Sequence, residues 1–226
     1  MIFFDKVTKL YNDNSLALDQ VTFAVEQGDF VSIVGHSGAG KTTLLKMILV
    51  EERPTSGAVY FNSTDIQTLG RRHLHRLRRK IGSVFQDFRL LPNKTAYENI
   101  AFTMEAAGRA DKDITSDVPH VLELVGLADK FWSFPYQLSA GEKQRVAIAR
   151  AIVNQPDILI ADEPTGNLDP INTFEVIQIF KKINDIGTTV ILATHNKAVI
   201  DALGRRVITM DSGRLVRDDK QGSYVL

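Results

Sequence analysis

The 226-residue sequence contains no cysteine and no run of apolar residues long enough to cross a bilayer. The lack of cysteine excludes disulfides and thiolate metal sites, and fits a reducing compartment. A transmembrane helix needs about 18 consecutive apolar residues, so we expect no membrane span. The start, MIFFDKVTKLY, has charges at positions 5 and 6 and lacks the apolar centre of a secretion signal. If the protein works at a membrane, another chain must hold it there.

A net charge is also lacking, because Lys+Arg and Asp+Glu both number 27. The chain therefore lacks the overall positive charge that would attract nucleic acid. One basic run, GRRHLHRLRRK, reaches Lys80 and could suggest a nucleic-acid or lipid site. Leu74, Leu77 and Ile81 within and after it are spaced for one helical face. This spacing favours an exposed helix with solvated arginines, so we expect no nucleic-acid partner.

The order of apolar patterns predicts an α/β fold. IFFDKVTKLY, VTFAVEQGDF and GAVYFN resemble strands, and FVSIVG followed by TTLLKMILV reads as strand, glycine loop and helix. Helical patterns follow in AYENIAFTMEAAG, DVPHVLELVGL and SAGEKQRVAIARAIV. Two continuous apolar runs, DILIAD and TTVILAT, then flank the helix-like TFEVIQIFKKIND. Such runs alternating with helices indicate a buried parallel sheet, here interrupted by a helical insert.

A glycine-rich loop joins the first of these buried strands to its helix. The segment GHSGAGKT fits G-x-x-x-x-G-K-[ST], in which backbone N–H groups point at phosphates at a helix N-terminus. In such a loop Lys41 reaches the β- and γ-phosphates and Thr42 places its hydroxyl on Mg²⁺. The alternative is a glycine turn that matches by chance. The predicted phosphate site comprises Gly35, His36, Ser37, Gly38, Ala39, Gly40, Lys41, Thr42 and Thr43.

Two carboxylates follow the apolar run DILIAD. Ligands of open α/β sheets bind at the carboxyl ends of the strands, where Asp162 and Glu163 are expected. Asp162 would hold Mg²⁺ through water, and Glu163 would accept a proton from an attacking water. The alternative is an Asp-Glu pair at the start of a solvated loop.

The segment LSAGEKQR, Leu138 to Arg145, has a structural and a functional interpretation. Ser139 and Glu142 form S-x-x-E, a capping box that begins a helix running to Val153. The same capped start, with Gly141 beside it, exposes backbone donors and a positive helix end to an anion. For the motif alone the structural interpretation is the stronger.

The motifs GHSGAGKT, LSAGEKQR, ILIADEP and NLD (Asn167–Asp169), in this order, resemble those of the ATP-binding-cassette (ABC) ATPases. The resemblance covers residues 1–226 as a single domain that uses ATP and Mg²⁺. It implies a P-loop NTPase fold: a RecA-like core with a mostly parallel sheet, an N-terminal antiparallel β-subdomain and an inserted α-helical subdomain. The expected limits are 1–88 and 156–226 for the core with the β-subdomain, and 89–155 for the helical subdomain.

The resemblance also implies a homodimer that forms on ATP binding. In that family the capped-helix motif of one copy lies opposite the glycine loop of the other, so Ser139, Gly141 and Glu142 would contact the second copy's nucleotide. Asp169 would line the seam between the copies. Ala140 departs from the family's usual glycine, but a helical residue needs no positive φ, so we expect it to be tolerated.

Three single residues match further positions of the family. Tyr11 would stack on adenine, with an ordinary strand tyrosine as the alternative. His195, directly after TTVILAT, would act with Glu163 at the γ-phosphate, although a lone histidine after a strand is usually a loop residue. Gln86, at the exit of the strand Ile81–Phe85, would be a neutral ligand of Mg²⁺ that moves with the helical subdomain.

The residues after Gln86 would receive an integral membrane partner. We expect Phe88, Leu90 and Leu91 as apolar anchors and Asp87 and Arg89 at the rim. The alternative is that Leu90 and Leu91 pack in the core of the helical subdomain.

VFQDFRLLPNKTAYENI and ADEPTGNLDP most resemble the cell-division members of the family. That resemblance implies a peripheral ATPase on the cytoplasmic face of the plasma membrane, at the division septum. There it would drive a membrane partner that controls septal peptidoglycan hydrolysis. The alternative is the ATPase of a lipoprotein-release or macrolide-export transporter. A soluble DNA- or ribosome-acting ATPase is disfavoured, because about 120 residues without heptads separate Lys41 from Asp162 and the chain has one cassette.

Overall fold

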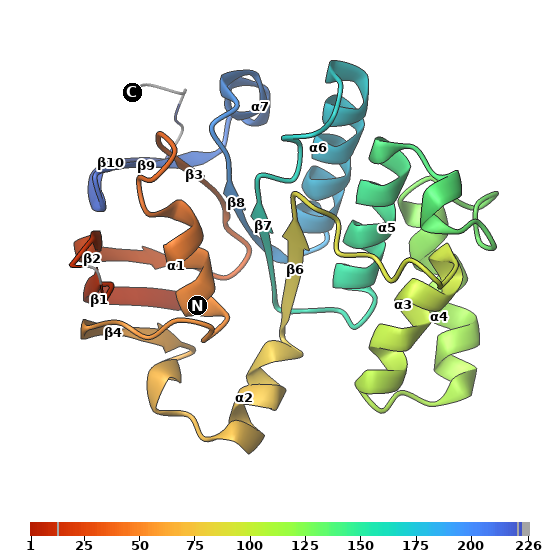
Figure 1. Cartoon of the computed structure of the whole chain (residues 1–226), viewed down its shortest axis with the longest axis horizontal. Coiled ribbons are helices and arrows are strands. Elements are labelled where there is room, and N and C mark those ends of the chain that lie inside the picture. The colour runs from red at the N-terminus through yellow and green to blue at the C-terminus, as the bar shows by residue number, and fades with distance from the viewer. Residues whose placement is uncertain (13, 221, 223–226) are drawn as a thin grey trace.

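A computed structural model describes residues 1–12, 14–220 and 222 of the chain. Two β-sheets and the helices around them make up the fold (Figure 1). The strands are β1 Ile2–Leu10, β2 Leu16–Val25, β3 Phe30–Val34, β4 Ser56–Phe61, β5 Thr64–Asp65, β6 Ile81–Phe85, β7 Ile158–Asp162, β8 Thr189–Ala193, β9 Arg206–Asp211 and β10 Arg214–Asp219. The helices are α1 Lys41–Ile48, α2 Arg71–Arg78, α3 Ala96–Ala106, α4 Asp111–Leu124, α5 Ala140–Ile152, α6 Pro170–Asp185 and α7 Lys197–Leu203, with 3₁₀ turns at Ile66–Thr68 and Pro135–Gln137.

The larger sheet has the order β10-β9-β3-β8-β7-β6. All its neighbouring strands are parallel except β10, which pairs with β9 in the antiparallel sense. Every residue of β3 and β8 is buried, because helices or the second sheet cover both faces. The predicted α/β fold with a mostly parallel sheet is confirmed.

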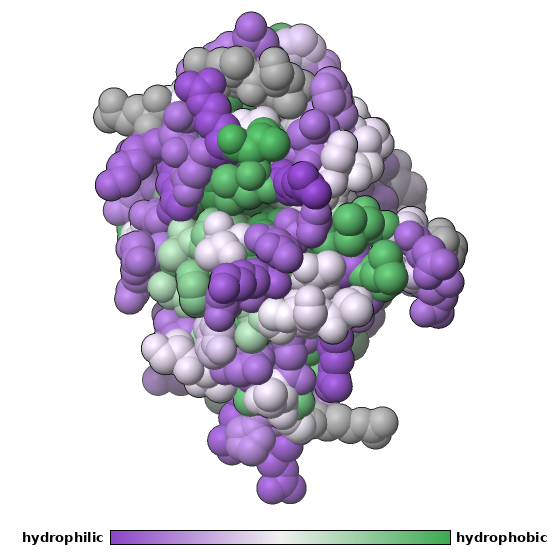
Figure 2. Space-filling view, turned by 90° about the vertical axis from the view of Figure 1, so that its left-hand side faces the viewer, coloured by the Kyte–Doolittle hydropathy of each residue, from purple (hydrophilic) through white to green (hydrophobic). Residues whose placement is uncertain are grey.

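The smaller sheet is antiparallel, with the order β2-β1-β4-β5, and lies on the side of the molecule that contains the N-terminus (Figure 1). Its inward residues, such as Phe4, share one apolar core with Leu44 of α1 and Ile33 of β3. Polar side chains cover most of the outward face of this part, with apolar side chains in separate patches (Figure 2). The antiparallel sheet at the N-terminus, also predicted, is confirmed.

Helices α3, α4 and α5 lie together on the opposite side of the parallel sheet (Figure 1). Capping boxes begin two of them: Thr95 with Glu98 at α3, and Ser139 with Glu142 at α5 as predicted. Their apolar faces, with Ile100, Val121 and Ile148, belong to one core that also contains buried residues of the parallel sheet and of α6. The expected limits of the helical subdomain, residues 89 and 155, fall in connecting segments and remain predictions.

Helix α2 is shorter than its sequence suggested. It ends at Arg78, and Ile81 is the first residue of β6, so the expected helical face of Leu74, Leu77 and Ile81 is wrong in its last member. Leu77 is buried and Leu74 half-buried, while the described arginines of the helix are exposed, as predicted. Within the described residues no helix is long and apolar enough to span a bilayer.

Candidate functional site

The carboxyl ends of four parallel strands bring part of the predicted site residues together. Phe85 pairs with Asp162, and Asp162 pairs with Ala193, so β6, β7 and β8 end side by side. Ile33 of β3 also pairs with Ala193, which places the glycine loop next to them. The segments that leave these strands surround a cavity of about 480 Å³. Its lining residues are Ala17, His36, Ser37, Gly38, Gly40, Lys41, Thr42, Thr43, Gln86, Asp162, Glu163 and His195.

The glycine loop needs glycine at two positions for different contacts. Gly40 has φ 102°, and a Cβ there would lie 2.6 Å from the carbonyl oxygen of Ala17. A Cβ on Gly35 would lie 2.3 Å from the carbonyl oxygen of Met210. Larger residues would displace the loop from the strands that support it. Helix α1 begins at Lys41, so its free N–H groups face the cavity.

The ammonium group of Lys41 is held inside the curl of this loop. Its Nζ donates hydrogen bonds to the carbonyl oxygens of Gly35 at 2.7 Å and His36 at 3.1 Å, and lies 3.9 Å from Glu163 Oε1. Ala39 differs from its neighbours, because its side chain is buried in the core and its N–H donates to His36 O. The loop thus presents a fixed positive charge to the cavity.

Thr42, Asp162 and Gln86 offer the oxygen atoms that Mg²⁺ prefers. Thr42 Oγ1 donates to Asp162 Oδ2 at 2.9 Å, while Asp162 Oδ1 is buried without a hydrogen-bond partner. Burial raises the pKa of Asp162, with the charge of Glu163 adding to the effect. A half-buried carboxylate with one buried, unpaired oxygen fits a cation that completes it, so these residues suit Mg²⁺.

Asn167 fixes the position of Gln86, a role that the sequence did not reveal. Gln86 Nε2 donates to Asn167 Oδ1, and Asn167 Nδ2 donates to the carbonyl oxygen of Gln86, both at 3.2 Å. A Cβ on Gly166 would lie 2.8 Å from Gln86 Nε2, so a larger residue there would shift this side chain. Asn167 belongs to the NLD motif, and this motif was the feature of the sequence that could have pointed to its role.

Glu163 and His195 form a pair across the cavity. His195 Nδ1 lies 2.7 Å from Glu163 Oε1, and the backbone N–H of His195 reaches Glu163 Oε2 at 3.4 Å. Glu163 has φ 48°, an unfavourable value for this residue type, and its N–H donates to Ala193 O at 2.9 Å. The β7–β8 pairing therefore fixes a carboxylate and an imidazole together at the mouth of the glycine loop.

Tyr11 lies beside the cavity rather than in its lining. Its hydroxyl is 3.5 Å from Thr43 Oγ1, and Lys9 Nζ lies 4.9 Å from the centre of its ring. One ring face is thus paired with a cation. The stacking role of Tyr11 remains a prediction.

Ser139, Gly141, Glu142 and Asp169 are outside the lining of this cavity. Hydrogen bonds from the Ser139 backbone lower the pKa of Glu142, and hydrogen bonds from Asn172 lower the pKa of Asp169. A Cβ on Gly141 would lie 1.8 Å from Asn172 Oδ1, so the N-termini of α5 and α6 pack closely there. The structure groups these four residues around two helix N-termini, apart from the glycine loop.

The segment after Gln86 is partly buried. Asp87 and Arg89 are exposed, as predicted for a rim, while Leu90 packs against the helical core, which supports the core alternative for that residue. Phe88 and Arg89 have φ 59° and 48°, and their carbonyl oxygens accept hydrogen bonds from Arg150 at 2.9 and 2.6 Å. No motif in the sequence pointed to this role of Arg150.

Comparisons with known proteins identify the family. The profile described as ABC transporter matches residues 18–166. The chain belongs to the ABC transporter family. It is 48% identical over 224 residues to the cell division ATP-binding protein FtsE of Bacillus subtilis, covering 99% of this chain and 98% of that protein. With the FtsE of Escherichia coli K12 the identity is 46%, covering 95% and 97%.

A solved ABC cassette has the same fold. The dimeric post-hydrolysis structure of the ATP-binding cassette MJ0796, bound to ADP and Pi, aligns with a TM-score of 0.88 and 36% identity, covering 99% of this chain and all of the other. The resemblance to the cell-division members and the expected P-loop NTPase fold are confirmed. The chain is accordingly an ABC-type ATPase.

Proposed function

We propose that this ABC ATPase binds and hydrolyses Mg·ATP as the motor subunit of a membrane complex in bacterial cell division. Relatives named as cell division proteins match nearly the whole chain at 46–48% identity, which supports the process. The observation that carries the proposal is the cavity where the glycine loop, the Thr42–Asp162 pair and the Glu163–His195 pair meet.

Nucleotide phosphates would lie on the glycine loop, against the backbone N–H groups of residues 35–43. Lys41 would exchange its bonds to the loop carbonyls for the β- and γ-phosphates. Thr42, Asp162 and Gln86 would hold Mg²⁺, which neutralises the charge that develops on the phosphates. Tyr11 would stack on the base from beside Thr43.

Glu163 would act as the general base. A water between it and the γ-phosphate would lose its proton to the carboxylate, which lies 3.9 Å from Lys41 Nζ. His195 would donate from Nδ1, 2.7 Å away, to this carboxylate and so orient it beside the γ-phosphate. Lys41 would balance the negative charge at this position.

The second half of each site would come from another copy of the chain. A capped helix begins with Ser139, Gly141 and Glu142. These residues lie outside the lining of the nucleotide cavity, so the free N–H groups of the helix cannot reach a phosphate bound to the same chain. In a head-to-tail homodimer these residues would cover the second copy's nucleotide, with Asp169 at the seam. Mg·ATP would then close the dimer and hydrolysis would open it.

An integral membrane partner, FtsX-like, would receive this motion near residues 87–91. Gln86 joins the nucleotide cavity to that segment, and Arg150 holds its carbonyl groups. The ATPase would then be peripheral, on the cytoplasmic face of the plasma membrane at the division septum, and would control peptidoglycan hydrolysis through its partner.

Co-purification from membranes tests this assignment. The partner should be recovered with the tagged chain, and reversing the exposed charge in Asp87→Lys should reduce recovery about tenfold. Binding of a fluorescent ATP analogue checks that the variant is folded. Full recovery with Asp87→Lys contradicts docking at this segment. Unimpaired septation after depletion of the chain, with lost drug or lipoprotein export, contradicts the cell-division role.

A further inference from the structure

Helix α2 lies in a stretch of the chain that has no acidic residue. Residues 66–86 contain no Asp or Glu, but they contain six of the chain's 27 Lys and Arg residues. The chain as a whole has equal numbers of acidic and basic residues, so positive charge is concentrated at this helix. Of residues 66–86 only Gln86 lines the nucleotide cavity, so ATP binding does not explain this charge.

The arginines of α2 are separated from its apolar side. Leu77 is buried and Leu74 half-buried, and both pack in the core that the parallel sheet shares with the smaller sheet. Arg72, Arg76 and Arg79 follow one another at steps of four and three residues, which places them in one stripe opposite these leucines. All three are exposed, and the backbone of Arg79 is still helical just after the last residue of α2. We call this stripe the arginine face.

Carboxylates of the described residues do not neutralise the arginine face. None of them pairs with Arg72 or Arg76, and Arg79 donates to a carbonyl oxygen, that of Ala106, at 3.5 Å. Lys80, the next residue, does pair with Asp157 at 3.1 Å and is therefore not counted in the face. Three neighbouring cations without a counter-charge favour a ligand that carries several negative charges.

Contacts on both sides of α2 fix the orientation of this face. Arg78 donates from Nε to the carbonyl oxygen of Leu49 at 3.2 Å and from Nη2 to that of Val50 at 3.4 Å, which ties the end of α2 to the segment after α1. Leu77 holds the helix to the core. The arginines of the face therefore point away from the protein without a change of the fold.

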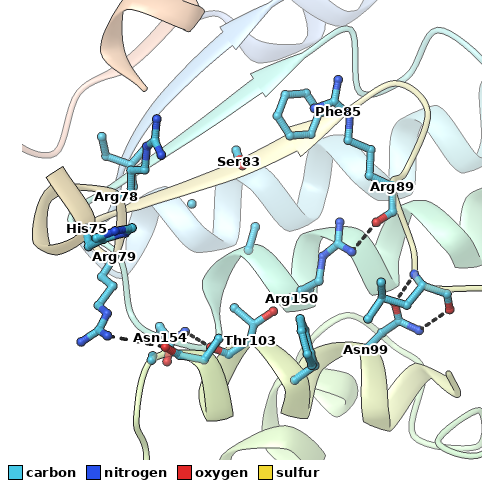
Figure 3. A pocket seen from close by; sticks show the side chains of 17 residues that line it. His75, Arg78, Arg79, Ser83, Phe85, Arg89, Asn99, Thr103, Arg150 and Asn154 are labelled. Carbon is cyan, nitrogen blue, oxygen red and sulfur yellow. Dashed lines mark hydrogen bonds between the residues drawn. The ribbon is translucent and has the colours of Figure 1, made fainter. Parts of the chain in front are cut away.

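One end of the arginine face lies beside the segment that we expect to meet the membrane partner. Arg79 and Arg89 line the same cavity of about 510 Å³, with His75, Arg78 and Arg79 on one side of it and Arg89 on the other (Figure 3). Helix α2 precedes the amino end of β6, whereas the nucleotide cavity lies at the carboxyl end of that strand (Figure 1). A membrane partner at residues 87–91 would thus bring the bilayer surface close to α2.

We propose that the arginine face of α2 binds the anionic headgroups of the membrane leaflet on which the chain lies. Lipid phosphates would contact Arg72, Arg76 and Arg79, whose side chains stay hydrated at the membrane surface, in keeping with their exposure. The inference rests on the proposed function, which places the chain at the membrane, and adds a direct contact with lipid. Each arginine contributes about fivefold in affinity, so the face would orient a chain that the partner holds.

Nucleic acid is the other polyanion that an arginine stripe could bind. Sites for single strands combine cations with aromatic side chains on which bases stack, and residues 71–79 contain no Phe, Tyr or Trp. Binding to duplex DNA depends on many phosphate contacts, and the neutral chain offers no wider basic surface around α2. A lipid surface needs only a short basic face, because the partner already keeps it near.

Sedimentation with lipid vesicles tests the inference on the full-length chain without a partner. One set of vesicles contains phosphatidylcholine alone, and the other contains equal parts of phosphatidylcholine and phosphatidylglycerol. We expect binding to the anionic vesicles to be at least about tenfold tighter at low salt and to weaken as salt is added. Arg72→Gln with Arg76→Gln should lower that affinity about twentyfold. Arg72→Lys with Arg76→Lys should keep it within about threefold, because headgroup attraction depends on the charge.

Lys112→Gln with Lys182→Gln is the matched control. It also removes two exposed positive charges, but from α4 and α6. Its affinity for anionic vesicles should stay within about threefold of wild type, because these charges lie outside the arginine face. The ATPase rate checks that both glutamine variants are folded, and it should be unchanged, since none of the four residues lines the nucleotide cavity.

Equal binding of the wild-type chain to both kinds of vesicle overturns the inference, and so do equal losses in the two glutamine variants. Tighter binding to duplex DNA than to anionic vesicles, abolished by Arg72→Gln with Arg76→Gln, also overturns it, because the face would then take nucleic acid. If the partner co-purifies but the chain shows no preference for anionic vesicles, the inference fails and the proposed function stands. If the vesicles bind as expected and the wild-type chain recovers no partner, the proposed function fails and the lipid contact stands.

Discussion

Thr42 Oγ1 donates a hydrogen bond to Asp162 Oδ2 over 2.9 Å and so connects the first turn of α1 to the end of β7. The other oxygen of the same carboxylate, Oδ1, is buried and has no hydrogen-bond partner. An ionised carboxylate whose one oxygen is buried and unpaired is unfavourable for the folded chain, and a cation at that oxygen would remove the penalty. This unpaired oxygen supports the proposal that Mg²⁺ binds here.

The first prediction is that Asp162→Asn stabilises the nucleotide-free chain. Burial raises the pKa of Asp162, so the folded state binds this proton more tightly than the unfolded state. Protonated Asp162 therefore adds to the free energy of unfolding at acid pH, and this contribution is lost as the pH rises through the raised pKa. Asparagine cannot ionise, so the variant should have the higher Tm on the alkaline side, and the difference should shrink toward acid.

Thermal unfolding measured across pH, with and without Mg·ATP, checks this prediction. With Mg·ATP the wild type should have the higher Tm, because only the wild type has the carboxylate for the metal. The amide oxygen introduced by Asp162→Asn could still accept the hydrogen bond of Thr42, so loss of that bond does not confuse the result. A difference in Tm that is independent of pH would show that ionisation of Asp162 has no part in it.

The second prediction is that Glu163→Gln keeps ATP binding and forms a stable dimer. Closure of two copies needs the nucleotide but not the base, while turnover should fall by about 10²- to 10⁴-fold. Light scattering during gel filtration with Mg·ATP measures the dimer, and phosphate release measures turnover. Asp157→Asn, just before the other end of β7, is the control and should behave as wild type. A variant that loses turnover yet stays monomeric at saturating Mg·ATP contradicts the shared site.

The third prediction concerns the contact between α5 and α6. Gly141→Ala would place a methyl group 1.8 Å from Asn172 Oδ1 and force that side chain away. Asn172 would then lose its hydrogen bond to Asp169. We expect a loss of about 1–3 kcal/mol in the free energy of unfolding, and weaker ATP-dependent dimerisation.

Ala140→Gly is its matched control, one residue earlier on an exposed position of the same helix. It restores the glycine usual in the family and should cost no more than about 1 kcal/mol. Urea unfolding and sedimentation with Mg·ATP compare the two variants. Equal stability losses would mean that the Gly141–Asn172 contact is not tight in solution.

Most of the site could be predicted because its residues follow buried strands. The register of a parallel sheet brings strand ends together, which was enough to expect the loop of Gly35 near Asp162, while the resemblance to the family was needed to add Gln86 and His195. The capping box at Ser139 could also be predicted, since it depends on residues only three positions apart.

Contacts between distant elements could not be predicted in this way. Arg150 reaches the carbonyls of residues 88 and 89 only because α5 packs beside β6. The start of α4 also differed: the pattern DVPHVLELVGL suggested a helix from Asp117, but the helix begins at Asp111 and contains Pro119. A proline normally marks a helix boundary, and here the residues on both sides continue the helix.

The last prediction concerns Asn99, which is 0% exposed in α3. Its Oδ1 accepts from Leu91 N at 2.7 Å, and its Nδ2 donates to the carbonyl oxygens of Leu91, Lys94 and Thr95. Asn99→Ala would leave these groups unpaired and should lower the free energy of unfolding by about 1–3 kcal/mol. The segment 91–95 would lose its anchor, so binding of the membrane partner should weaken as well.

Asn154→Ala is the comparison for this variant, because Asn154 is only half-buried and donates a single bond, to Thr103 O at 3.3 Å. Urea unfolding of both variants should give the larger loss for Asn99. Asn99→Asp separates the two sides of the amide, since it keeps the acceptor for Leu91 N but loses the donors and brings a buried charge. It should therefore be no more stable than Asn99→Ala. A stable Asn99→Asp would mean that the donors of Asn99 contribute little and that the N–H of Leu91 is the group that needs a partner.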